Sequence, residues 1–595
     1  MLNKIKTLLW NRKYVFLFIG LFIIVLSQRF LSDKQRGLMN SVSSDGVGYY
    51  CYLPAAVIYQ DFSYRFYYQD ENKINPFYRP GITKYKDSGV NKYYCGTAIC
   101  LLPFFLVGVL ISLIAGTDVN GYTDTFLMLV SIASIIYYLL SVFFISKIAK
   151  FFNVPEKISL VGCLIFFFGT NLFHYTIQEP SMSHAYSFFA ISLFLYLFTR
   201  IIERKDPTNF IILGLAFGLV FLIRPVNVII ILFTPFFFNN FKEYLIFLKS
   251  ILVCNLKGFF YFVLAVLVSI FIQFLLYYFQ TGDFIIVSYE GETFNFFKPE
   301  FLNVLFSYRK GLMLYVPILF WAFLFILLTN NNWYKKVVFF ITFASFLYIT
   351  SSWWCWWYGG SLSIRPIIDI LPTFILFSIL LFHKLAAIKR RLVLLVSIPF
   401  LFYNQLLAYQ YSNLLIETEN MDKEKFWDAF LATDYNSILE NKKNRILKDK
   451  SIIKTELLNY EDTIADSRIV LGGYKSEKAC IVGKTNYYSK GFSITKTDLN
   501  IDDSFYLLVE CMVKVQEEDK RLALVVAATQ NEIMTGWYIV LKSQFKTNED
   551  GWLKMTNIVE IDKSLLGDHS NIKIFVNSDK GLSLIDDLSY SIIRK

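Results

Sequence analysis

Eleven apolar runs, each close to the roughly 20 residues that a helix needs to cross a bilayer, constrain this chain more than any other feature. They lie at 14–30, 122–146, 158–176, 183–202, 209–223, 225–238, 259–279, 311–329, 337–354, 367–383 and 391–411. Charged residues make up only 18% of the chain, against about 25% in soluble proteins. The sequence therefore predicts a polytopic α-helical membrane protein with about eleven spans.

The placement of lysine and arginine predicts how these spans are oriented. Basic residues favour cytoplasmic loops. If the N-terminus is inside and the further apolar run 96–116 does not cross the bilayer, all five short connections between spans that are rich in lysine and arginine lie in the cytoplasm. Segment 96–116 then becomes a re-entrant or interfacial helix within an outer loop, 31–121. The +11 net charge reflects anchoring at a plasma (inner) membrane with a cytoplasmic N-terminus, and it does not indicate nucleic acid binding.

Two parts of this topology leave alternatives open. The runs 209–223 and 225–238 meet at Arg224-Pro225, so they form either two short spans or one kinked helix. After the membrane domain, 1–411, we expect a helical linker, 412–460, and an extracytoplasmic β-sandwich, 461–595. Alternating or strand-like runs predict its strands at 505–513, 521–529, 535–543, 552–560, 571–577 and 583–593. Cys480 and Cys511 could pair if this domain lies outside the cytoplasm.

Candidate acid–base residues lie at the predicted outer face. Asp45 follows the first span in Ser43-Ser44-Asp45-Gly46-Val47-Gly48-Tyr49, where its carboxylate could take a proton or hold a cation, and its glycines could let the backbone turn closely around a ligand. Glu179 and His184 share the short loop between two spans, where a buried acid is costly and tends to be functional. The alternatives are an Asp that forms a turn and a His that caps a helix.

Cations and aromatic residues complete the predicted site. Arg224, Arg309 and Arg365 lie near outer helix ends, and the guanidinium fork suits a phosphate. Tyr49, Trp356 and Trp357 are candidate substrate-binding residues, and four tryptophans fall within 353–357, which suits a platform for stacking a sugar. Each arginine and tryptophan could instead anchor the chain at the membrane interface.

At these residues the chain resembles the GT-C glycosyltransferases, in particular the protein-O-mannosyltransferase and aminoarabinose-transferase branch. The resemblance covers about residues 1–411. It implies Asp45 and Glu179 as catalytic acids, Arg224, Arg365 and Arg309 as ligands of the donor phosphate, and His184 beside the substrate. It also implies a divalent cation, Mg²⁺ or Mn²⁺, held by Asp45, Glu179 and His184, although the second acid is Glu instead of the commoner Asp.

The implied activity is transfer of a sugar, with inversion, from a polyprenyl-phosphate donor to a glycan, lipid or protein acceptor at the extracytoplasmic face. A polysaccharide polymerase or ligase is the alternative, and it would not need the acid at Asp45. A transporter of lipid-linked glycans would show repeat symmetry or broken helices at mid-membrane, and neither pattern is found in the sequence. The tail resembles carbohydrate-binding β-sandwiches through Ile585-Asp586-Asp587-Leu588.

Overall fold

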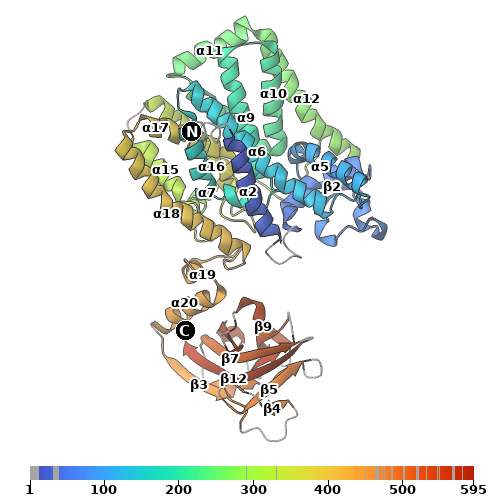
Figure 1. The fold of residues 1–595 in the computed structure, drawn as a ribbon, viewed down its shortest axis with the longest axis vertical. Coiled ribbons are helices and arrows are strands. Elements are labelled where there is room, and N and C mark those ends of the chain that lie inside the picture. The colour runs from blue at the N-terminus through green and yellow to red at the C-terminus, as the bar shows by residue number, and fades with distance from the viewer. Residues whose placement is uncertain are drawn as a thin grey trace, which may run out of the picture. The chain divides into compact units, whose positions relative to one another are not determined.

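A computed structural model shows two compact units, each described here by itself (Figure 1). Residues 1–412 and 418–420 form the first unit, and residues 413–417 and 421–595 form the second. The described residues are 12–30, 39–86, 88–289, 291–329, 332–448, 450–461, 468–471, 473–474, 476–483, 487–499, 503–517, 521–530, 533–545, 547, 550–565, 570–578 and 581–595.

The first unit is helical apart from one small hairpin near its start. Its elements are α2 (Lys13–Phe30), η1 (Met39–Ser41), α3 (Asp45–Tyr50), α4 (Tyr52–Val57), η2 (Arg65–Tyr68), η3 (Asp70–Asn72), η4 (Pro76–Tyr78), β1 (Ile82–Tyr85), β2 (Ser88–Asn91), α5 (Gly96–Ala115), α6 (Asp124–Phe151), α7 (Glu156–Gly169), α8 (Leu172–Ile177), α9 (Ser183–Glu203), α10 (Pro207–Ile223), η5 (Pro225–Phe237), α11 (Phe241–Cys254), α12 (Leu256–Thr281), α13 (Phe301–Phe306), α14 (Leu312–Tyr315), α15 (Pro317–Leu328), α16 (Trp333–Ser352), α17 (Ile367–Lys384) and α18 (Ala387–Ser412).

Six described helices are long and apolar enough to cross a membrane, or seven if the bent pair η5 and α11 is one span. The chain is thus a multi-pass membrane protein, and the count of eleven spans stays a prediction. Segment 96–116 forms one unbroken helix, α5, which is among the six by length and composition. Whether α5 crosses the bilayer or is re-entrant stays a prediction.

The break at Arg224 follows from the proline after it. Proline disfavours the helical conformation of the preceding residue, and Arg224 is extended, with φ −154° and ψ 112°. The run after it does not continue α10 as one kinked α-helix, and whether the two runs form two short spans stays a prediction. The run after Arg224 is a 3-10 helix, η5, which turns by 110° into α11. Arg224 therefore lies at the end of α10, where its side chain is not confined between packed helices.

Two helices form the centre of the first unit, and two others form part of its periphery. In α9 and α17, 78% of the apolar window is buried within the protein, whereas in α12 and α18 only 17% and 22% is buried. A helix that is apolar on all sides and is left uncovered by the rest of the protein faces lipid. We therefore place α12 and α18 against the bilayer and α9 and α17 in the core.

The second unit is a two-sheet sandwich with two helices before its first strand. Its elements are α19 (Lys423–Ala429), α20 (Tyr435–Lys448), β3 (Ile452–Leu458), β4 (Ile469–Leu471), β5 (Lys478–Gly483), β6 (Phe492–Thr495), α21 (Lys496–Leu499), β7 (Phe505–Glu517), β8 (Ala523–Gln530), β9 (Ile533–Leu541), η6 (Lys542–Gln544), β10 (Leu553–Ile561), η7 (Lys563–Leu565), β11 (Ser570–Asn577) and β12 (Leu582–Arg594).

The strands form two antiparallel sheets that share one apolar core. One sheet has the order β10-β7-β12-β5-β4 with β3 also on β12, and the other has the order β6-β11-β8-β9. The six predicted strands are all present. The expected linker 412–460 belongs mostly to this unit, because Leu439 and Ile446 of α20 join the core and β3 pairs with β12.

One expectation for this unit is wrong. Cys480 and Cys511 are free thiols. Strand β12 lies between their strands, so the two strands are separated by two spacings of about 4.8 Å each, which is too far for a disulfide. Asp586, in the segment that resembles carbohydrate-binding sandwiches, is fully buried and accepts hydrogen bonds from the amide of Tyr474 and the hydroxyl of Ser476.

Candidate active site

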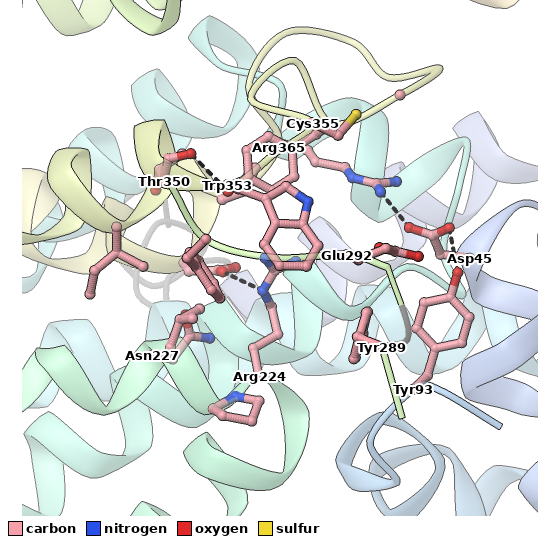
Figure 2. A pocket seen from close by; sticks show the side chains of 18 of the residues that line it. Asp45, Tyr93, Arg224, Asn227, Tyr289, Glu292, Thr350, Trp353, Cys355 and Arg365 are labelled. Carbon is pink, nitrogen blue, oxygen red and sulfur yellow. Dashed lines mark hydrogen bonds and ion pairs between the residues drawn. The ribbon is translucent and has the colours of Figure 1, made fainter. Parts of the chain in front are cut away.

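A cavity of about 620 Å³ lies within the helical unit, at the ends of several of its helices (Figure 2). Its walls come from α3, the connection between β2 and α5, the break between α10 and η5, the tryptophan-rich segment after α16, the first turn of α17, and Tyr289, Glu292 and Phe294 before α13. Asp45, Tyr49, Arg224 and Arg365, four of the residues predicted from the sequence, line it together. Segments up to 320 residues apart in the chain thus meet at one site.

Asp45 is held in the cavity wall by a cation and a phenol. Its carboxylate forms an ion pair with the guanidinium of Arg365 and accepts a hydrogen bond of 2.7 Å from the hydroxyl of Tyr93, as Figure 2 shows. Burial alone would raise the pKa of Asp45, but Arg365, Tyr93 and Lys92 outweigh it and lower the pKa below its ordinary value. The carboxylate is therefore ionised at neutral pH and can accept a proton.

Close packing of the short helix α3 explains the two glycines after Asp45. A Cβ on Gly46 would lie 1.9 Å from the hydroxyl oxygen of Ser181, and one on Gly48 would lie 2.1 Å from the ring of Tyr93. The glycines therefore let α3 pack against protein neighbours, and they do not let the backbone turn around a ligand, as the sequence suggested. They bring Asp45 next to Tyr93 and to the loop between α8 and α9.

Arg224 is fixed by a buried carboxylate on α17. Its Nε lies 3.2 Å from Oδ2 of Asp369, and the other carboxylate oxygen lies 2.9 Å from Nδ1 of His184. Nε2 of His184 in turn lies 3.3 Å from Nη1 of Arg224, so the three side chains form a closed group. The side chains of Asp369 and His184 are 1% exposed, whereas that of Arg224 is 17% exposed and lines the cavity. Asp369 therefore acts as the internal counterion that holds Arg224 at the wall.

A second ion pair lies on the same wall. Lys92 Nζ is 2.5 Å from a carboxylate oxygen of Glu292, and the indole of Trp354 donates to the other oxygen at 3.4 Å. Lys92 also lies 5.5 Å from the ring centres of Tyr93 and Tyr289. The cavity thus combines cations, carboxylates and aromatic faces, the groups that bind a phosphorylated sugar.

Several predicted site residues lie elsewhere. Glu179 does not line the cavity, because its carboxylate turns to Nε2 of His174 at 3.3 Å. His184 is buried behind Arg224 and does not touch the cavity, so it cannot contact a substrate directly. Arg309 is engaged by the backbone oxygen of Glu419 and the side chain of Asn420, and it stacks on Trp357 at 3.6 Å.

The aromatic wall also differs from the prediction. Trp357 lines the cavity and Trp356 does not, while Trp353 and Trp354, which were not singled out as site residues, do. The backbone of this segment pairs with the segment before α13, where Phe294 and Trp353 form an isolated bridge. That pairing turns the first two tryptophans toward the cavity. Tyr49 lines the cavity as predicted, with its ring 4.7 Å from that of Tyr93.

The predicted metal ligands do not gather. Among the described residues no group of three His, Cys, Asp or Glu side chains could hold a metal ion. Asp45 faces a guanidinium, Glu179 faces His174, and His184 is engaged by Asp369. A cation at Asp45 would have to displace Arg365 against charge repulsion. The residues Asp45, Glu179 and His184 therefore do not fit a common metal, and we derive no step through one.

Four functional residues escaped the sequence reasoning: Tyr93, Lys92, Glu292 and Asp369. Asp369 carried a signal that could have found it, namely an acid in the first turn of an apolar helix, where an unpaired charge is costly. Tyr93 and Lys92 lie just before Gly96 in a segment that the sequence marked only for its place in the predicted outer loop. Glu292 lies in a loop without a local motif, and only the fold reveals its partner.

Comparisons with known proteins found solved structures but no matching family model and no matching curated protein. The oligosaccharyltransferase of Archaeoglobus fulgidus in its apo form matches with 13% identity and a TM-score of 0.37, over 70% of this chain and 57% of that chain. AglB from the same organism, in complex with an inhibitory peptide and a dolichol-phosphate, matches with 12% identity and a TM-score of 0.36, over 71% and 57%.

The arabinosyltransferase EmbB of Mycobacterium smegmatis matches with 10% identity and a TM-score of 0.28, over 97% of this chain and 64% of that chain. This chain therefore spans less than two thirds of the length of each of these structures. All three are glycosyltransferases, the class that the sequence resembles. We base the functional proposal on the cavity itself.

Proposed function

We propose that this protein is a membrane glycosyltransferase that moves a sugar from a polyprenyl-phosphate donor to an acceptor bound in the same cavity. One observation carries the proposal: an ionised carboxylate, Asp45, shares a cavity with Arg224 and Arg365 at the ends of membrane helices. A base and two phosphate-binding cations are what transfer from a lipid-linked sugar phosphate requires. The cavity volume of about 620 Å³ suits a ligand of this size.

The two arginines receive the donor phosphate. Each keeps part of its side chain exposed to the cavity, 17% for Arg224 and 12% for Arg365. A guanidinium offers several donors in a fixed plane, which matches the oxygens of a phosphate. The sugar then lies against the aromatic wall that Tyr289, Trp353 and Trp354 provide, because the apolar faces of sugar rings pack on aromatic rings.

Asp45 accepts the proton of the acceptor. The acceptor oxygen, or nitrogen if it is an amine, attacks the anomeric carbon and forms the new glycosidic bond. The bond from that carbon to the phosphate oxygen breaks, the electron pair leaves with the polyprenyl phosphate, and the configuration inverts. The acceptor's proton passes to Asp45, and Arg224 and Arg365 stabilise the charge that develops on the leaving phosphate.

Tyr93 and Asp369 position this machinery. Burial and the neighbouring Asp45 carboxylate raise the pKa of Tyr93, so its phenol remains a hydrogen-bond donor that orients the carboxylate. Asp369 orients Arg224. We assign no chemical step to Glu179, since it lies outside the cavity wall. The cavity faces the extracytoplasmic side of a plasma membrane in this proposal, with the N-terminus in the cytoplasm and the β-sandwich outside.

The test is a transfer assay with purified protein in lipid vesicles. Radiolabelled polyprenyl-phosphate sugars are offered with membrane-derived acceptors in the presence of Mg²⁺, Mn²⁺ or EDTA. The metal conditions are included because the sequence predicted a bound cation, whereas the described residues form no site for one. We expect Asp45→Asn to lower transfer by about a hundredfold or more, the usual contribution of a general base. The matched control is Asp118→Asn, which changes an exposed aspartate of the same unit.

The outcomes separate the parts of the proposal. Near-normal transfer by Asp45→Asn would show that Asp45 is not the base. Absence of transfer from every donor by the unaltered protein, under all three metal conditions, would overturn the glycosyltransferase assignment. Assembly of long polymers from a single repeat unit would favour the polymerase reading of the sequence instead.

A further inference from the structure

The described part of the segment between α12 and α13, residues 283–289 and 291–300, exposes more large apolar side chains than a water-facing loop would. We call it the cavity loop. Phe297 is 99% exposed, Ile285 is 79% exposed and Val287 is 76% exposed. Such a run of exposed apolar side chains in a folded protein indicates a surface that another apolar phase covers. The exposed apolar side chains of the loop and of α13 are Phe284, Ile285, Val287, Phe294, Phe296, Phe297, Phe301, Leu302 and Phe306.

The first part of the cavity loop folds back along a lipid-facing helix. The ring of Phe284 lies 4.5 Å from that of Tyr278 and 6.3 Å from that of Phe271, both on α12. Phe271 precedes the end of α12 at Thr281 by ten residues, about 15 Å along the axis. Tyr278 and Phe271 are exposed, as expected for a helix that is only 17% buried. The loop therefore returns below the end of a helix that faces the bilayer.

The second part of the cavity loop is tied to α16 in the same way. The hydroxyl of Tyr348 donates to the backbone oxygen of Phe296 at 3.0 Å, and the two rings lie 5.8 Å apart. The ring of Phe301 packs on the same tyrosine at 6.2 Å. Tyr348 lies one turn before the end of α16 at Ser352. The first part of the loop thus lies beside α12, one of the six apolar helices, and the second part lies beside the last turns of α16, which the sequence predicts to be a span.

The opposite side of the cavity loop is polar and lines the cavity. Glu292 forms its ion pair with Lys92. Glu292 and Tyr289 both line the cavity, where Figure 2 labels them. The loop is therefore amphipathic across its thickness. One side carries the charge and hydroxyl groups of the site, and the other side carries exposed Ile285, Val287 and Phe297.

We propose that the cavity loop is inserted into the bilayer leaflet on the cavity side and forms the wall between the cavity and the lipid. Its depth is set by the exposed Lys298 and Glu300, which hold it at the boundary between headgroups and acyl chains. A ligand with a hydrocarbon chain then reaches the cavity sideways, past this loop. The proposal concerns the position of the loop in the membrane and does not depend on the reaction.

The experiment measures the depth of single fluorophores in vesicles. Cys254 and Cys355 are replaced by serine, since the other six cysteines are buried, and an environment-sensitive dye is attached to Ile285→Cys or Phe297→Cys. The protein is reconstituted in phosphatidylcholine with bromine at defined acyl positions. Leu267→Cys, 58% exposed in the middle of α12, is the reference for the bilayer. Lys73→Cys, whose side chain is 72% exposed, is the reference for water.

We expect both loop positions to be quenched strongly, and most strongly by bromine near the headgroup, whereas position 73 is not quenched. Quenching at both positions no greater than at position 73 would overturn the proposal, and so would quenching at only one, because insertion requires both halves of the loop. If Ile285→Cys fails to elute as the unaltered protein does in gel filtration, Val287→Cys replaces it, and if Phe297→Cys fails, Phe296→Cys, at a position 45% exposed, replaces it. Loss of sugar transfer would not affect this measurement.

Discussion

Neutralising Asp369 is the sharpest test of how the cavity is built. In Asp369→Asn the side chain keeps its shape and can still accept from Nδ1 of His184. The carboxylate oxygen that faces Nε of Arg224 at 3.2 Å is replaced by the amide nitrogen or the uncharged carbonyl oxygen of asparagine. Arg224 then remains in a buried place without a negative charge beside it. The variant therefore removes one half of an ion pair and nothing else.

The expected cost follows from the burial of the two partners. Removing one member of a buried ion pair costs about 3–5 kcal/mol. Asp369 is 1% exposed, but Arg224 keeps 17% of its side chain toward the cavity, so water relieves part of the penalty. We expect about 3 kcal/mol, at the lower end of the range. The exposed pair of Lys73 and Asp118, with side chains 72% and 61% exposed, contributes below about 1 kcal/mol.

Thermal unfolding in one detergent measures this difference. Asp369→Asn should lower the midpoint by several degrees, and Asp118→Asn should leave it unchanged within error. The double variant Asp369→Asn/Arg224→Met removes both charges and should recover much of the lost stability, since no uncompensated buried charge remains. It should nevertheless transfer no sugar, because in the proposed reaction Arg224 binds the donor phosphate.

Two results would refute the reasoning. If Asp369→Asn were as stable as Asp118→Asn, the buried charge of Arg224 would have another counterion. If the double variant were less stable than Asp369→Asn, the methionine would not replace the packing of Arg224, and the ion pair would not be the reason for the loss.

Three further predictions concern other parts of the helical unit. Asp45→Asn should tighten the binding of an isoprenyl phosphate, measured by quenching of tryptophan fluorescence, because Arg365 loses its internal partner; weaker binding than in the unaltered protein would contradict this. Gly46→Ala should lower the free energy of unfolding by about 1–3 kcal/mol, since its Cβ would lie 1.9 Å from Ser181 Oγ. Adding Ser181→Gly should restore the stability, and an unchanged stability of Gly46→Ala would show that α3 can move away from Ser181. Burial and neighbouring arginines lower the pKa of Lys310 to about 7 from 10.5, so above pH 7 the folded state binds fewer protons than the unfolded state. The free energy of unfolding should therefore rise with pH between about 7 and 10, by up to about 1.4 kcal/mol per pH unit. Lys310→Met should abolish this rise, and a flat pH profile of the unaltered protein would refute the prediction.

The elements of the sandwich could be predicted because their pattern is local. The expected strand at 505–513 corresponds to β7, and the other five predicted strands agree with the structure within a few residues. Alternation of inward and outward side chains is encoded within each strand. The order of the strands is not, since β12 pairs with β3 and β7, far apart in sequence. The free thiols of Cys480 and Cys511 depend on that order.

The candidate site was predictable as far as single residues indicate their chemistry. Asp45 stood out as an acid followed by glycines, and Arg224 and Arg365 stood out as guanidinium groups near outer helix ends; the structure brings the three to one cavity. Their partners could not be predicted. Glu179 pairs with His174, five residues before it, and not with a distant group. Asp369 pairs with Arg224, 145 positions before it in the chain. The packing of α17 against α9 and η5 brings the two residues together, and no local pattern in the sequence indicates it.

The pairing of the cations before any ligand binds explains how the site persists and how it is switched on. An unpaired guanidinium at the end of a membrane helix would be costly, so Arg224 and Arg365 each need a carboxylate, and Asp369 and Asp45 supply them. The two carboxylates differ in what they do next. Asp369 stays buried behind Arg224, but Asp45 shares Arg365 with the cavity. A donor phosphate that takes over Arg365 removes the largest of the influences that lower the pKa of Asp45, while the burial that raises it remains, so the pKa of Asp45 rises. Asp45 would thus become a stronger base only when the donor is in place, which limits proton transfer to the loaded cavity.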